Sequence, residues 1–163
     1  MSGVRLFISY SHRDRAWRDR LGIHLRIFEV LEGLRVWSDR WITAGAAWRE
    51  EILRAIDASQ LAVLLVSADF LSSDFILQVE LPRILERHRA GELKIVPILV
   101  QDCAWQEIPW LAELQMRPSD AVPLAARRRH GSEAELAKIA REILALSRMT
   151  PGAQEGPQTI GAS

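Results

Sequence analysis

The chain has 163 residues and a mass of 18.5 kDa, enough for one globular domain and too little for two full ones. Hydrophobic residues make up 48% and charged residues 26%, and 21 basic residues balance 21 acidic ones. This neutrality argues against a general nucleic-acid binder, no apolar run is long enough to span a membrane, and one cysteine excludes an internal disulfide. An N-terminus without the pattern of a signal peptide completes the prediction of a cytoplasmic domain.

The first half of the chain alternates apolar runs typical of strands with segments of helical periodicity. Residues 4–10 predict a strand, and Ser11 with Asp14 three positions on resembles a capping box that opens a helix. A short strand at 34–37 and an irregular segment at 38–47 follow. The expected apolar stripe of the first helix is Trp17, Leu21, Leu25, Phe28 and Leu31, and that of the next helix is Trp48, Ile52, Ala55 and Ile56. Both Trp17 and Trp48 are expected to be core anchors.

The second half continues the alternation. Residues 60–67 are apolar almost throughout, as in a strand covered on both faces. A helix is predicted over 72–85, with Pro82 forcing a kink or a fresh start. A strand is predicted over 94–100, where Pro97 favours an edge position or a bulge. A short fifth strand is predicted at 121–124. The last predicted helix opens with a capping box, Ser132 and Glu135.

Strands that alternate with helices predict an α/β fold: a flavodoxin-like open parallel sheet of about five strands with helices on both faces. The domain is expected to cover residues 1–149. Residues 150–163 are rich in Pro, Gly, Ala and Ser without periodicity, which is typical of a flexible linker or tail. We expect this linker to lead to a sensor domain that the chain does not contain.

Common catalytic motifs are missing from the sequence. It has no GxxxxGK[ST] or GxGxxG phosphate-binding loop, its four histidines are scattered, and Cys103 has no partner cysteine, so no metal site is expected. Asp39, Asp69 and Asp102 follow predicted strands, as the acids of a phosphoacceptor receiver domain would. Such a domain needs two adjacent acids after its first strand, where this chain has Ser9-Tyr10-Ser11, and that argues against a receiver domain.

Four motifs, in this order, resemble the Toll/interleukin-1 receptor (TIR) domain family, particularly its bacterial members. They are FISYSHRD at 7–14, WSDRWITAGAAWREEI at 37–52, VSADFLSSDFILQVELP at 66–82 and IVPI at 95–98. The motif at 37–52 resembles the BB loop of the family and the helix after it. Each motif alone is a loose pattern, but the ordered set is specific and covers residues 4–148.

The resemblance implies an activity, because many members of the family cleave the nicotinamide–ribose bond of NAD+. The position that matches their catalytic glutamate is Glu80, and NAD+ would be the consumed substrate, with no other cofactor. Catalytic members often have a tryptophan four residues before the glutamate, where this chain has Ile76, and Phe75 beside it is expected to supply the aromatic surface. The residues that the resemblance places around the substrate are Tyr10, Ser11, Ile42, Gly45, Ser67, Phe70, Phe75 and Ile76.

A single carboxylate suits this chemistry. Glycoside hydrolases usually need a second one to protonate a poor leaving group. The nicotinamide of NAD+ is already cationic and leaves as a neutral base, so no general acid is required. The remaining task is to stabilise the positive charge that grows on the ribose, which one carboxylate can do electrostatically.

Three alternatives stay open at this point. Glu80 can be a solvated helix residue or an ion-pair partner of Arg83 or Arg87. The domain can be a non-catalytic TIR scaffold for homotypic interactions, since other members self-associate through the loop that matches residues 39–47, which carries Trp41, Ile42 and Gly45. A nucleoside deoxyribosyltransferase-like enzyme, which also uses a glutamate on a similar sheet, is the third.

Overall fold

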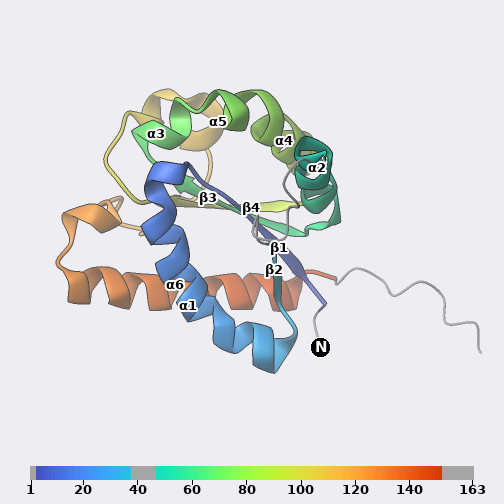
Figure 1. The fold of residues 1–163 in the computed structure, drawn as a ribbon. Helices are drawn as coiled ribbons and strands as arrows, with labels where there is room; N and C mark the ends of the chain where they lie inside the picture. The colour runs from blue at the N-terminus through green and yellow to red at the C-terminus, as the bar shows by residue number, and fades with distance from the viewer. Residues whose placement is uncertain (1–2, 38–46, 152–163) are drawn as a thin grey trace, which may run out of the picture.

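A computed structural model describes residues 3–37 and 47–151, and Figure 1 shows a parallel sheet between two layers of helices. Its strands are β1 (Arg5–Ser9), β2 (Arg35–Val36), β3 (Leu61–Val66) and β4 (Lys94–Leu99), in the order β2-β1-β3-β4. The α/β fold with an open parallel sheet is therefore confirmed. From residue 152 on, the predicted linker lies outside the described residues.

The fifth strand that the sequence predicts at 121–124 is wrong. Residues 121–123 form no regular element, Leu124 begins a single turn of 3-10 helix, η5 (Leu124–Ala126), and the described sheet has four strands. One isolated bridge, between Ile98 and Arg117, extends the β4 edge. Apolar residues alone cannot make a strand when no neighbouring strand pairs along their length.

The predicted places of the central and edge strands are confirmed. All six residues of β3 are buried, as expected for a strand with helices on both faces. β4 lies at the edge, where the Pro97 carbonyl accepts a hydrogen bond of 3.0 Å from the Arg117 backbone N–H. Proline is tolerated here because a residue facing the edge of a sheet needs no N–H for a strand ladder.

The two faces of the sheet carry separate cores. α1 (Arg15–Glu32) and α6 (Arg129–Met149) cover one face, and α2 (Trp48–Ala58) and α4 (Leu81–Arg89) cover the other, together with α3 (Ala68–Leu71) and α5 (Pro109–Ala112) (Figure 1). Side chains alternate along β1, so that Leu6 and Ile8 enter the α1–α6 core and Phe7 enters the α2–α4 core. Two further 3-10 turns are η1 (His12–Asp14) and η4 (Trp105–Glu107).

Helix α1 ends as expected, but the capping box predicted at its start is wrong, because the Asp14 side chain makes no cap hydrogen bond there. Ser11 caps η1 by accepting a hydrogen bond from the Arg13 backbone N–H, and Gly33 ends α1 with a left-handed φ of 71°. Leu31 is a correction to the predicted apolar stripe, because it is 68% exposed. It belongs to a second face of α1 whose side chains are all exposed, namely Ile23, Ile27, Val30 and Leu31. The α1 side chains that pack in the α1–α6 core include those of Leu21, Leu25 and Phe28, and Leu31 lies outside this contact.

The predicted capping box at Ser132 is also wrong. α6 begins at Arg129, and Ser132 is buried inside it, where its hydroxyl donates to the Arg129 carbonyl. The same hydroxyl accepts a hydrogen bond of 2.7 Å from Arg20 on α1. Glu133 binds both His24 and Arg20, and these hydrogen bonds lower the pKa of its carboxyl group. The polar residues therefore join α6 to α1 instead of capping a helix.

Candidate active site

A pocket of about 450 Å³ opens near the carboxyl end of β1, on the side covered by α2 and α4. Ligands of open parallel sheets bind beyond the carboxyl ends of the strands, and this volume lies in the range of small-molecule sites. The residues that line it are Phe7, Ile8, Tyr10, Ser11, His12, Trp37, Trp48, Ile52, Ser73, Phe75, Ile76 and Glu80.

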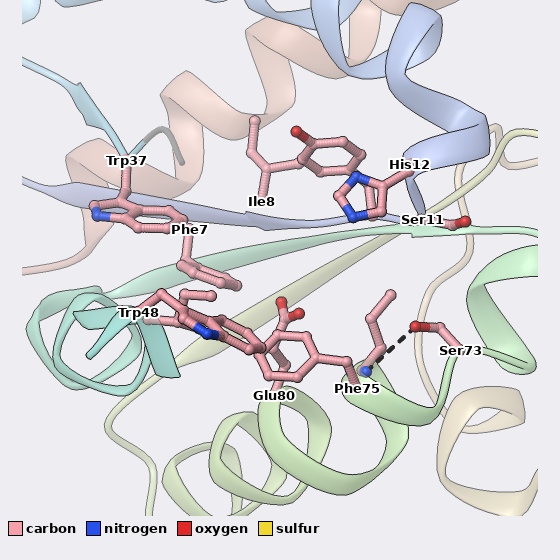
Figure 2. A pocket seen from close by; sticks show the side chains of 12 residues that line it. Phe7, Ile8, Ser11, His12, Trp37, Trp48, Ser73, Phe75 and Glu80 are labelled. Carbon is pink, nitrogen blue, oxygen red and sulfur yellow. Dashed lines mark hydrogen bonds between the residues drawn. The ribbon is translucent and has the colours of Figure 1, made fainter. Parts of the chain in front are cut away.

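Glu80 contributes a carboxylate to this mostly apolar pocket. It ends the π turn η3 (Ile76–Glu80), directly before α4, and is only 7% exposed. Figure 2 shows its carboxylate directed toward Phe7, beside the rings of Trp48 and Phe75. A carboxylate held among apolar side chains acts on a nearby positive charge more strongly than one in bulk water.

The two arginines next to Glu80 in sequence join α4 to α2. Arg83 forms ion pairs with Asp57 and Glu86. Arg87 donates to the carbonyls of Ile56 and Ser59 at the end of α2 and forms an ion pair with Glu92. Both guanidinium groups are thus engaged in fixing the helix that follows Glu80.

Two aromatic pairs form walls of the pocket. The rings of Phe7 and Trp37 stack with centroids 5.3 Å apart, and those of Trp48 and Phe75 lie 4.7 Å apart at 50°. The prediction that Trp48 is a core anchor is wrong, because its side chain is 48% exposed. It is the first residue of α2, and the core on this face is filled instead by Ile52 and Ile56 from the following turns.

We therefore expect Trp48→Ala to affect ligand binding more than folding. Loss of a half-exposed side chain should cost less than about 2 kcal/mol of unfolding free energy, below the about 3–5 kcal/mol of a buried aromatic. Thermal unfolding, together with titration of a ligand that carries planar rings, such as NAD+, measures both quantities. A large fall in stability with unchanged affinity would restore the core-anchor interpretation.

The structure gathers most of the predicted site residues. Tyr10, Ser11, Phe75, Ile76 and Glu80 all line the pocket. Ile42 and Gly45, and with them Asp39 and Trp41, lie outside the described residues. Ser67 and Phe70 do not line the pocket: both are almost completely buried, and Ser67 caps α3 by accepting a hydrogen bond of 3.0 Å from the Phe70 backbone N–H.

Several lining residues were not predicted. Trp37 ends the short segment that forms β2, so the rule that ligands bind beyond strand ends would have included it. His12 follows the predicted Ser11 in the sequence, and Ser73 lies between the predicted Phe70 and Phe75. Phe7 gave no usable signal, because a strand phenylalanine is as easily a core residue and here it is both.

Asp14, the buried acid near this edge of the sheet, has structural partners. The Asp14 side chain is completely buried, accepts a hydrogen bond from the Ser67 hydroxyl and another of 3.2 Å from Gln101. These bonds join the segments that follow β1, β3 and β4. Burial raises the pKa of the Cys103 thiol, which argues against a thiolate nucleophile there. Within residues 3–37 and 47–151, no group of three His, Cys, Asp or Glu side chains is placed to hold a metal ion.

The described chain is thus an α/β protein with an open parallel sheet, and its mostly apolar, aromatic-walled pocket beyond β1 holds the carboxylate of Glu80. A family model described as TIR domain matches residues 6–140, and the chain therefore belongs to the TIR domain family. None of the helices in the described ranges is long and apolar enough to cross a membrane.

Three proteins to which the chain is similar share between 22% and 34% sequence identity with it. The chain is 34% identical over 175 residues to "Uncharacterized protein y4lF" of Sinorhizobium fredii, an alignment that covers 96% of this chain and 52% of the relative. It thus spans about half the length of that protein. Among solved structures, the TIR domain of the Toll-related receptor TRR-2 from Hydra magnipapillata is 22% identical, with a TM-score of 0.49 over 83% of this chain and 97% of that one. The TIR domains of the activated Roq1 resistosome that recognises the effector XopQ are 24% identical, with a TM-score of 0.47 over 85% and 84%.

Proposed function

We propose that this TIR domain is an NAD+ glycohydrolase of the bacterial type, which cleaves the nicotinamide–ribose bond with Glu80 as its catalytic carboxylate. The observation that carries the proposal is the position of Glu80, which is nearly buried and directed into the pocket beyond β1 (Figure 2). The resemblance to NAD+-cleaving members selects the same residue. We place the activity in the cytoplasm, in a signalling or defence protein.

The reaction breaks the bond between the nicotinamide nitrogen and the ribose carbon, and the bonding electrons leave with nicotinamide. Positive charge grows on the ribose as the bond lengthens, and the Glu80 carboxylate stabilises it electrostatically. A water molecule then adds to the same carbon and loses a proton, which gives ADP-ribose. The aromatic pairs Trp48–Phe75 and Phe7–Trp37 offer flat surfaces for the rings of the substrate.

The direct test is incubation of concentrated protein with NAD+, with nicotinamide release followed by chromatography. We expect nicotinamide and ADP-ribose to accumulate in equal amounts. A purified, folded protein that releases no nicotinamide at any concentration would contradict the proposal. It would favour the second function, a non-catalytic scaffold that recruits other TIR domains.

We further propose that activity depends on association between TIR protomers through residues 39–47, which the sequence motif matches to the BB loop of the family. If the site is completed across two protomers, specific activity should rise with protein concentration, and a dilute monomer should be nearly inactive. Gly45→Pro should lower both association and cleavage, because proline fixes φ. Light scattering and nicotinamide release over a hundredfold concentration range measure both.

Two outcomes would contradict this model of assembly. One is a constant specific activity in a chain that stays monomeric over the whole range. The other is loss of association in Ile27→Glu, on the exposed apolar face of α1, while Gly45→Pro associates normally. This latter outcome would assign the contact to α1.

A further inference from the structure

We infer that the π turn η3 (Ile76–Glu80) is a one-residue insertion that sets the angle between Phe75 and Glu80, so that both face the pocket. The inference rests on the proposed function and extends it to the residues that position its carboxylate. Phe75 and Glu80 are five positions apart, yet both line the pocket, and Figure 2 shows them side by side.

A regular α-helix would not allow this arrangement. Residues five apart on an α-helix point about 140° away from each other, whereas residues four apart share a face. In η3, the Leu81 backbone N–H bonds to the carbonyl of Ile76, five residues earlier. This wider turn brings residues five apart onto one face, as π turns do at many functional sites.

The buried residues on either side fix the register of the insertion. Ile76, Leu81 and Ile84 are 2%, 3% and 0% exposed and belong to the same core. A regular helix buries positions i, i+4 and i+7, whereas these residues stand at i, i+5 and i+8. The chain therefore contains one residue more than a regular helix would need between its two anchors. Leu77, at 42% exposed, and the exposed Gln78 lie in that stretch.

Local chemistry holds the wide turn in place. Pro82 cannot donate a hydrogen bond to the Gln78 carbonyl, and in a regular helix its ring would clash with that group. At the other end, the Ser73 carbonyl accepts a bond of 2.9 Å from the Leu77 N–H, and its hydroxyl accepts one of 3.4 Å from the Ile76 N–H. Pro82 and Ser73 thus favour a break in the helix at the place where the extra residue is absorbed.

The consequence for the site is that Phe75, and not Ile76, extends to the aromatic wall with Trp48. If the same sequence formed a regular helix and Phe75 kept its contact with Trp48, the Glu80 side chain would point away from Phe75. The π turn therefore positions the Glu80 carboxylate relative to the ring of Phe75.

The test changes the length of the turn. Deletion of Gln78 leaves Phe75 and Glu80 four residues apart and restores the i, i+4, i+7 pattern of Ile76, Leu81 and Ile84. We combine the deletion with Pro82→Ala, because the proline ring would oppose a regular helix. We expect this deletion variant to form a regular helix and to keep kcat and KM for NAD+ within about fivefold of the Pro82→Ala protein. Insertion of one alanine after Gln78 places Phe75 and Glu80 six residues apart. We expect kcat to fall by about 100-fold or more, as it does when a group that stabilises transition-state charge is removed. Gln78→Ala, which keeps the length, is the control and should change neither constant.

Thermal unfolding and NAD+ binding, followed by tryptophan fluorescence, accompany the kinetics. A deletion variant that unfolds at the parent temperature but loses more than 100-fold in kcat would overturn the inference, as would full activity in the insertion variant. If the parent releases no nicotinamide, the proposed function fails separately. The inference is then judged by a crystal structure of the deletion variant, which should show a regular helix with Phe75 and Glu80 still in the pocket.

Discussion

Glu80→Gln is expected to lower kcat for nicotinamide release by at least about 100-fold, the usual effect of removing a group that stabilises transition-state charge electrostatically. Glutamine keeps the size and part of the hydrogen bonding of Glu80 but loses the negative charge that would face the ribose. We expect the unfolding midpoint to change little, because the substitution leaves the volume inside the pocket almost unchanged.

Glu86→Gln is a matched control for this experiment. Glu86 lies on α4, the helix that follows Glu80, but its side chain is 69% exposed and pairs with Arg83. The Glu86→Gln variant should release nicotinamide at the same rate as the parent protein. More than about a tenth of the parent activity in Glu80→Gln would show that Glu80 is not the essential electrostatic group, since such losses are usually far larger.

Phe70→Ala is expected to be the most destabilising of these substitutions, at a cost of about 3–5 kcal/mol of unfolding free energy. Phe70 is completely buried between the sheet and the helices of the α2–α4 face, so truncation leaves a cavity. This loss is a large part of the about 5–15 kcal/mol that stabilises a typical domain. Chemical denaturation followed by circular dichroism measures it.

Phe75→Ala makes the same chemical change in the pocket wall and serves as the comparison. Its ring is only partly buried and contacts Trp48, so its loss should cost less stability and weaken NAD+ binding more. Equal destabilisation by the two variants, with binding lost only in Phe70→Ala, would instead assign the substrate-binding role to Phe70, as the family resemblance implies.

Apart from the fifth strand, the sequence determined the order of the strands and of the main helices along the chain, because these follow from local patterns. The continuous apolar run of β3, the glycine that ends α1 and the proline that suits the edge strand β4 each predict structure from neighbouring residues alone. The ordered motifs also selected Glu80, and the structure places it in the pocket with Tyr10 and Ser11.

Only the tertiary structure decided which partners the polar and aromatic residues have. Ser132 has the sequence pattern of a helix cap but binds Arg20 of another helix, and Trp48 has that of a core residue but forms the pocket wall with Phe75. In each case the partner is distant in sequence, so no local pattern contains it. The π turn is a similar case: the spacing of Phe75 and Glu80 contradicts helical periodicity until two buried anchors, Ile76 and Leu81, fix how far the chain must turn between them.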